Sequence, residues 1–111
     1  MFAYEAAAAF RQALQLDGRQ AHVHGLLGNL LADQGHLEEA AESYRRMLEI
    51  DPKDRVAHNN LGGVLRRQGR LEEAAAAYER ALEIDPSLLA ARSNLLFVRH
   101  SLATQPSELL L

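Results

Sequence analysis

The sequence predicts an all-α protein in which antiparallel helix hairpins stack into a solenoid. The first observation is a repeat: LGGVLRRQGRLEEAAAAYERALEIDP, which begins at Leu61, matches LGNLLADQGHLEEAAESYRRMLEIDP, which begins 34 residues earlier at Leu27. The second is that apolar residues in each copy recur every three or four positions, the spacing of one helix face. The third is that glycine and proline fall at the same offsets in both copies, where helices would end. Such a period is typical of helical hairpins that cannot each bury a core alone.

The composition indicates a single domain, residues 1–111, and excludes several classes of function. The chain is 48% hydrophobic and 24% charged, which is ordinary for a globular unit. Its net charge of −3 comes from interleaved acidic and basic residues, so we expect no nucleic-acid partner. No apolar run reaches the roughly 18 residues that a membrane span needs, so we expect no membrane partner. The absence of cysteine removes disulfides and thiol chemistry and fits a cytoplasmic location.

Residues 1–20 are predicted to form the second helix of a partial repeat. Counting back one period places Ala6, Phe10 and Ala13 at second-helix positions, with Gly18 in place of the proline that ends the later copies. The first helix of this repeat is missing from the sequence. We therefore expect the chain to be a segment of a longer protein.

Residues 21–54 and 55–88 are predicted to be two full repeats, identical at about half of their positions. In each first helix, Gly28 or Gly62 is expected where two helices approach closely, and Gly35 or Gly69 ends the helix. The second helices are expected to begin at Leu37 and Leu71. Their first turns hold paired glutamates, which favour the positive end of a helix dipole. Each is ended by an Asp-Pro pair, because proline cannot continue a helix.

These residues resemble the tetratricopeptide repeat (TPR) family over nearly the whole chain. The L-G, the alanine, the aromatic, the A-L and the D-P stand at the family's offsets in both copies, apart from Met47, where the family usually has alanine. The resemblance implies a right-handed TPR superhelix. His24 and His58 replace the family's usual tryptophan, and we expect their rings to be buried between paired helices.

Residues 89–103 are predicted to form a capping helix, and residues 104–111 a tail. The stripe Ala91, Leu95, Val98 and Leu102 would pack back onto the preceding repeat. Arg92 and Arg99 replace buried packing residues of the family pattern and are expected on a wet outer face, as a cap requires. The final SELLL could begin a further helix.

The resemblance implies that the first helices line a concave groove whose outward positions select a ligand. The candidate groove residues are polar or aromatic and lie on this outward strip: Asn29, Asn59, Asn60, Arg66, Arg67, Asn94 and Phe97.

Asn60 and Asn94 are 34 residues apart, so they recur at one height in the groove. Side-chain amides can donate to and accept from a peptide backbone, which suits an extended peptide. The alternative is that these asparagines are only solvated polar residues. Arg66 and Arg67 could fix an acidic group, but the favoured interpretation is that they complement the helix dipole. The chaperone-tail clamp of some TPR proteins is not expected, because His22, Val56 and Ala90 stand where its lysines would recur.

The favoured function is a protein–protein interaction scaffold that binds an extended peptide or a partner helix. HNNLG and RSNLLF also resemble the TPR region of bacterial O-linked N-acetylglucosamine transferase-like proteins, so the alternative is a substrate-presenting arm of a glycosyltransferase-like enzyme. We expect no enzymatic activity and no cofactor, because no phosphate loop or nucleophile motif is present. No metal site is expected either, since His22 and His24 point apart on a helix. The unpaired terminal helices could support self-association.

Overall fold

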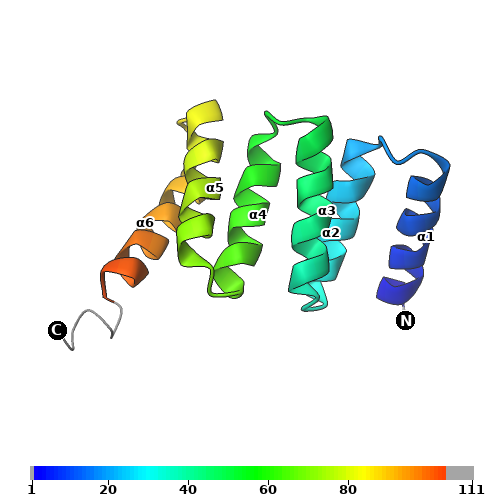
Figure 1. Ribbon diagram of the computed structural model, residues 1–111, viewed down its shortest axis with the longest axis horizontal. Coiled ribbons are helices and arrows are strands. Elements are labelled where there is room, and N and C mark those ends of the chain that lie inside the picture. The colour runs from blue at the N-terminus through cyan, green and yellow to red at the C-terminus, as the bar shows by residue number, and fades with distance from the viewer. Residues whose placement is uncertain (1, 105–111) are drawn as a thin grey trace.

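The computed structural model describes residues 2–104, which form helices and the turns between them. The helices are α1 (Phe2–Leu16), α2 (Ala21–Asp33), α3 (Leu37–Ile50), α4 (Arg55–Arg67), α5 (Leu71–Ile84) and α6 (Leu89–Ala103). Figure 1 shows them side by side in a row from α1 to α6, along a molecule of 53 × 30 × 19 Å. No strand occurs among residues 2–104, which confirms the all-α fold. The predicted SELLL helix lies outside the described residues.

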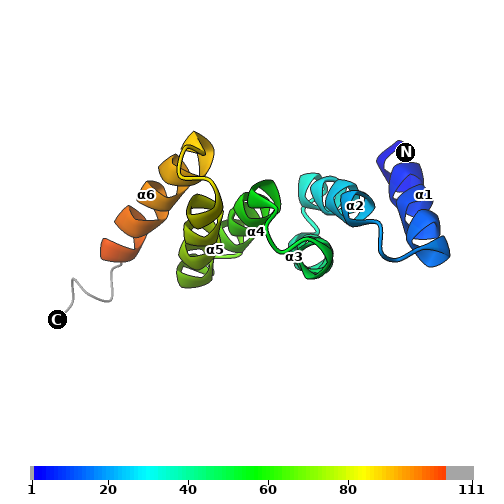
Figure 2. The same cartoon turned by 90° about the horizontal axis from the view of Figure 1, so that it is seen from above.

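Two layers of helices produce a curved array (Figure 2). Consecutive helices pack against each other. The backbone of α4 also lies close to α2 and to α6, whereas the backbones of α1, α3 and α5 do not approach one another, although Arg11 of α1 pairs with Glu39 of α3 at 3.1 Å. The layer of α2, α4 and α6 is therefore the inner layer, because helices on the concave side of a bent array lie closer together. First helices line the concave face, as expected.

Glycine ends α2 and α4 in the predicted way. Gly35 and Gly69 have φ of +83° and +78°, in the left-handed region that only glycine adopts without strain. Behind Gly35, the N–H of His36 donates to the Leu31 carbonyl at 2.8 Å, and the N–H of Gly35 donates to Ala32 at 3.0 Å. This is the Schellman arrangement, which satisfies the last carbonyls of the helix. The next helices then begin at Leu37 and Leu71, as predicted.

Helix pairs approach closely at Gly28 and Gly62. A Cβ atom at Gly28 would lie 2.8 Å from Tyr44 Cε1, and one at Gly62 would lie 2.6 Å from Tyr78 Cε1. The two tyrosine rings thus occupy the space that a side chain would need, which confirms the prediction for both glycines. Met47 is the residue that departs from the family pattern. Its sulfur packs on Gly25, where a Cβ would lie 2.8 Å from Sδ.

The core consists of two clusters that meet at α4. One joins α1 to α4 around Leu27, Leu31 and Tyr44, and the other joins α4 to α6 around Leu65, Tyr78 and Val98. Leu61 packs against both clusters, so each hairpin is completed by its neighbours. The predicted stripe of α6 is buried at Ala91, Leu95 and Val98 and partly buried at Leu102.

The expectation that His24 and His58 are buried is wrong, whereas Arg92 is exposed, as expected. His24 and His58 are only partly buried, and each ring Nε2 hydrogen-bonds a backbone carbonyl six residues earlier, Gly18 at 2.9 Å and Pro52 at 2.8 Å. Arg92 makes the equivalent contact, because its Nη2 donates to the Pro86 carbonyl at 2.6 Å. These side chains fix the turn before each inner helix.

Arg99 is exposed, as the sequence predicted, and makes one contact that the sequence did not predict. It turns back and donates to Glu79 of α5 at 3.3 Å. The outer face of α6 is wet, yet one of its two charges holds α6 to the preceding helix.

Candidate functional site

The concave face exposes apolar side chains that the core does not use. Leu26 of α2, Val56 of α4 and Phe97 of α6 are 46%, 49% and 56% exposed, respectively, whereas Leu27, Leu31, Val64, Leu65, Leu95 and Val98 of the same helices are almost fully buried. One residue from each inner helix therefore presents apolar surface on this side. Two clefts lie between these helices.

The first cleft lies between α2 and α4, has a volume of about 360 Å³ and is mostly apolar. Met47 of α3 closes it from behind, through the gap that Gly25 leaves. Its lining residues are His22, Gly25, Leu26, Asn29, Met47, Val56, Ala57 and Asn60. This apolar cleft can take a hydrophobic side chain of a ligand.

The second cleft lies over α4, between α2 and α6, has a volume of about 210 Å³ and is polar. Its lining residues are Ala32, Tyr44, Asn59, Asn60, Gly63, Val64, Arg66, Arg67 and Asn94. Asn60 lines both clefts, so the apolar cleft and the polar cleft adjoin. Five of the seven predicted groove residues meet in the polar cleft. Asn29 lines the apolar cleft, and Phe97 lines neither.

Side-chain amides bridge successive inner helices. Asn60 Nδ2 donates to Asn29 Oδ1 at 3.4 Å, and Asn94 Nδ2 donates to Asn59 Oδ1 at 3.3 Å. Each bridge uses one of the two N–H groups of the donor amide, so the second N–H and the carbonyl oxygen of Asn60 and of Asn94 remain for a ligand. The period of the sequence did not reveal these pairs, because the bonded residues are 31 and 35 apart.

The two predicted arginines have different surroundings. Arg67 Nη1 donates to the Ala32 carbonyl at 3.0 Å, which ties α4 to the last turn of α2. Arg66 instead lies with its guanidinium carbon 5.4 Å from the ring centre of Phe97, a cation–π contact between α4 and α6. Among residues 2–104, no carboxylate forms an ion pair with Arg66.

Two buried tyrosines, which sequence reasoning placed only in the core, also contribute hydroxyl groups at the concave side. Tyr44 donates to Asn29 Oδ1 at 2.5 Å. The Tyr78 hydroxyl is buried and has no hydrogen-bond partner in the described chain. The signal that could have found this difference is the repeat alignment, in which Gly63 stands one period after Asn29.

Burial raises the pKa of both hydroxyls, because it disfavours the charged phenolate. Burial, and next the nearby Asp33 carboxylate, raise the pKa of Tyr44 to about 12. Burial also raises the pKa of Tyr78, whereas the charge of neighbouring Arg66, and next its closeness as a hydrogen-bond donor, oppose this shift. Arg66 and Tyr78 are thus neighbours, although no pair of their atoms has the geometry of a hydrogen bond. Both hydroxyls stay protonated at neutral pH.

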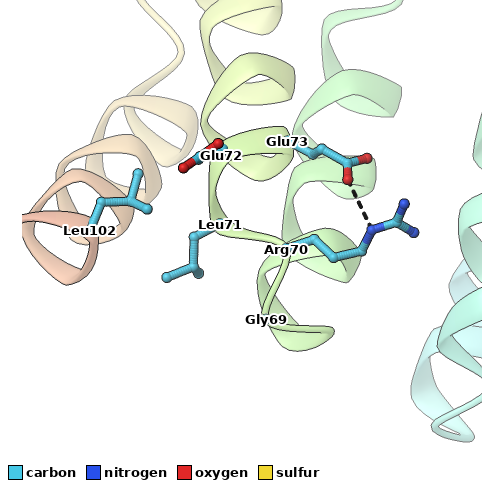
Figure 3. Close-up of a pocket in the computed structure, with 6 residues that line it drawn as sticks. All are labelled: Gly69, Arg70, Leu71, Glu72, Glu73 and Leu102. Atoms are coloured by element: carbon cyan, nitrogen blue, oxygen red, sulfur yellow. Dashed lines mark hydrogen bonds and ion pairs between the residues drawn. The ribbon is translucent and has the colours of Figure 1, made fainter. Parts of the chain in front are cut away.

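A further hollow of about 260 Å³ lies away from these clefts, where the turn between α4 and α5 meets the end of α6 (Figure 3). Leu71 and Leu102 point into it, and Arg70 Nε pairs with Glu73 at 3.0 Å beside it. Of its charged groups, Arg70 and Glu73 are already paired with each other, and Glu72 is exposed to solvent.

Residues 2–104 contain no candidate metal centre and no candidate membrane span. No three His, Asp or Glu side chains gather there as metal ligands would. No helix there combines the length and apolar character needed to cross a bilayer.

Solved structures with similar folds are numerous. MamA superposes with a TM-score of 0.85 at 23% identity over 87% of this chain and 57% of its own. A second MamA structure gives 0.87 at 20% identity over 91% of this chain and 55% of that one. The first TPR of Spaghetti (RPAP3), bound to the HSP90 peptide SRMEEVD, gives 0.89 at 20% identity over 92% and 81%. The chain thus spans just over half of each MamA chain.

Sequence comparison identifies the family. No curated protein is significantly similar to this chain. Two family profiles do match: "Tetratricopeptide repeat" over residues 56–88 and "TPR repeat" over residues 28–69. Together they cover residues 28–88, more than half of the chain, and they agree with the solenoid of helix hairpins. The chain belongs to the tetratricopeptide repeat family.

Proposed function

We propose that the chain is a protein–protein interaction scaffold that binds an extended peptide on the concave face of α2, α4 and α6. The observation that carries this proposal is the pair of adjoining clefts, one apolar and one polar, linked by Asn60. A peptide lying across them would place a hydrophobic side chain near Leu26 and Val56. Its backbone would meet the amides of Asn60 and Asn94. The Spaghetti TPR, which has this fold and holds a peptide, supports the proposal.

An extended peptide fits this face better than a partner helix. The free N–H and carbonyl groups of Asn60 and Asn94 can pair with the backbone of an extended chain, whereas a helix has already bonded its own backbone. A partner helix is the second form that the ligand could take, held by Leu26, Val56 and Phe97.

The experiment is a selection of 12-residue peptides from a random phage-displayed library, followed by affinity measurement with the selected peptides. Replacing both amides, Asn60→Ala with Asn94→Ala, should weaken binding by about tenfold, because two neutral hydrogen bonds are lost. The control is Gln12→Ala, which removes an exposed amide from α1, outside the concave face. Equal affinity of the double variant and the wild type would remove the amides from the site.

A second proposal is that this chain is the substrate-presenting arm of a larger glycosyltransferase-like enzyme. It rests on the row of asparagines on the concave face, which resembles the corresponding region of bacterial O-linked N-acetylglucosamine transferase-like proteins. Sequencing the gene beyond the codon for Leu111 separates the two proposals. An α/β sugar-nucleotide domain would support the arm, and a stop codon would exclude it. The bacterial source and cytoplasmic location stay predictions from the sequence.

Self-association through the terminal helices is a separate proposal. The exposed apolar residues Tyr4 and Leu16 lie on α1, and Leu89 and Leu96 lie on α6. A contact between α1 of one molecule and α6 of another would cover part of this surface. Light scattering tests it: a mass that stays monomeric up to millimolar concentration would contradict self-association through either helix.

A further inference from the structure

The two full repeats differ around the tyrosine that packs behind the polar cleft. In the first repeat, the Tyr44 hydroxyl donates to the side-chain oxygen of Asn29 at 2.5 Å. In the second repeat, Gly63 stands in the place of Asn29, and the Tyr78 side chain is 0% exposed with its hydroxyl unpaired. The second repeat therefore lacks the oxygen atom that satisfies the tyrosine in the first.

The same repeat adds a cation beside that hydroxyl. Arg66 stands in the place of Ala32, one period earlier. Its Nε is buried and has no acceptor within residues 2–104. Relative to the first repeat, the polar cleft has lost an acceptor and gained a charged donor. A buried donor without an acceptor costs free energy, so both groups favour a ligand that supplies an oxygen.

The Tyr78 hydroxyl and Arg66 Nε lie behind the surface of the polar cleft, where both atoms are buried. Gly63 and Arg66 both line it, together with the Asn94 amide. A Cβ atom at Gly63 would lie 3.9 Å from the Tyr78 hydroxyl oxygen, with no nearer atom in the way. The hydroxyl thus lies directly beneath a wall that has no side chain. Phe97 holds the Arg66 guanidinium at the α6 side of the cleft.

We propose that the polar cleft binds the carboxylate of an aspartate or glutamate side chain of a peptide lying along the concave face. One carboxylate oxygen would take the place that Asn29 Oδ1 has in the first repeat and accept from Tyr78. Arg66 would donate to the same carboxylate, as a charge-assisted hydrogen bond. The carboxylate belongs to an internal residue, because the concave face continues on both sides of the polar cleft, to Leu26 on α2 and to Phe97 on α6. This inference rests on the proposed function.

The test uses the random phage-displayed library of 12-residue peptides on four forms of the full chain: the wild type, Arg66→Gln, Tyr78→Phe and the control Arg80→Gln. Arg80 is an exposed arginine of α5 that pairs with Glu83 at 3.0 Å. Peptides selected by the wild type and by the control should carry Asp or Glu at one aligned position. Replacing that residue by Asn or Gln should weaken binding about ten- to a hundredfold, the range of a hydrogen bond to a charged group. Arg66→Gln and Tyr78→Phe should each lose most of this preference.

The outcomes separate this inference from the proposed function. If no peptide is enriched, the proposed function fails as well. If peptides are enriched without an acidic position, or if Arg66→Gln keeps the full preference, only the carboxylate site is wrong. Selection of peptides through a free C-terminal carboxylate, abolished by amidation, would also overturn the internal site. Circular dichroism tests whether each variant is folded. If Tyr78→Phe does not fold, the result for Arg66→Gln alone tests the carboxylate site.

Discussion

Tyr44 and Tyr78 occupy equivalent places in their repeats but meet different surroundings. Both rings fill the gap opposite a glycine, Gly28 or Gly62, and both are almost completely buried. Their hydroxyls differ, because Tyr44 donates to Asn29 and Tyr78 has no partner among residues 2–104. The two tyrosines thus contribute differently to stability, because only Tyr44 has an acceptor for its hydroxyl.

This difference predicts opposite results for the two Tyr→Phe variants. Tyr44→Phe should lower the free energy of unfolding by about 1 kcal/mol, because it removes a hydrogen bond and leaves Asn29 with a weaker one. Tyr78→Phe should leave the free energy of unfolding unchanged or raise it slightly, because it removes a buried polar group that is unsatisfied. Urea denaturation of both variants measures the effect. A Tyr78→Phe variant as destabilised as Tyr44→Phe would show that the Tyr78 hydroxyl has a partner in solution.

The raised pKa of Tyr44 predicts a loss of stability at high pH. Its pKa is about 12 in the folded chain, above the value of about 10 for an unfolded chain. Its contribution is therefore complete below pH 10 and is lost as the pH rises from about 10 to 12, because the unfolded chain releases the proton first. The wild type should lose more stability than Tyr44→Phe between pH 9 and about pH 11.5, measured by urea denaturation. Equal losses in both proteins would contradict the shift.

At the scale of the elements, the distance between α2 and α3 and between α4 and α5 depends on a glycine that packs against a tyrosine ring. Gly62 lets α4 approach α5, and Gly63 beside it faces the concave side. The inner helices also share one type of hydrogen bond near their first residues. His24, His58 and Arg92, one period apart, each bond the carbonyl six residues earlier. The angle at which each hairpin follows the last is thus held by one side chain.

Gly62→Ala and Gly63→Ala should therefore have opposite effects on stability. At Gly62 the new Cβ would clash with the buried ring of Tyr78 at 2.6 Å, and overpacking costs about 1–3 kcal/mol. At Gly63 the nearest atom is 3.9 Å away, so alanine should stabilise α4 by up to about 1 kcal/mol through its helix propensity. Thermal unfolding followed by circular dichroism compares the two. A stabilised Gly62→Ala variant would mean that the α4–α5 pair is looser than described.

At the scale of the whole molecule, stability is shared between neighbours along a row. The two core clusters meet around Leu61 of α4, and α1 packs on α2 and pairs with α3 only through Arg11 and Glu39. The helices of the middle are covered on both sides, whereas α1 buries little besides Ala7. In a solenoid such differences produce unequal local stability, because each unit depends on its neighbours.

Hydrogen exchange should show this gradient. Backbone amides of α4 and α5 should exchange slowest and those of α1 fastest, because α1 can detach without opening either central helix. Native-state exchange measured by NMR or mass spectrometry gives the rates. The substitution Leu61→Ala, at the junction of the clusters, should accelerate exchange in all of α2 to α5. Uniform protection from α1 to α6 would show that the row unfolds as one unit.

The sequence by itself determined the fold, the starts of α3 and α5 and the roles of four glycines. These features depend on local chemistry and on a repeat that occurs twice in the chain, so a role assigned to a residue in one repeat applies to its equivalent in the other. Gly28 and Gly62 could be assigned to close approaches, and Gly35 and Gly69 to helix ends, because such positions exclude larger side chains. The seven candidate groove residues were likewise placed on the concave side by register alone.

Only the tertiary structure decided how those residues are connected. The amide pairs join residues that are not one period apart, Arg67 is engaged by Ala32, and Arg99 turns back to Glu79. These contacts cross between helices, so they depend on the distance and tilt of neighbouring hairpins, which no spacing within a helix contains. The unsatisfied hydroxyl of Tyr78 is of the same kind. A repeat alignment shows that Gly63 replaces Asn29, but only the packing of α4 on α5 shows which buried atom that replacement leaves without a partner.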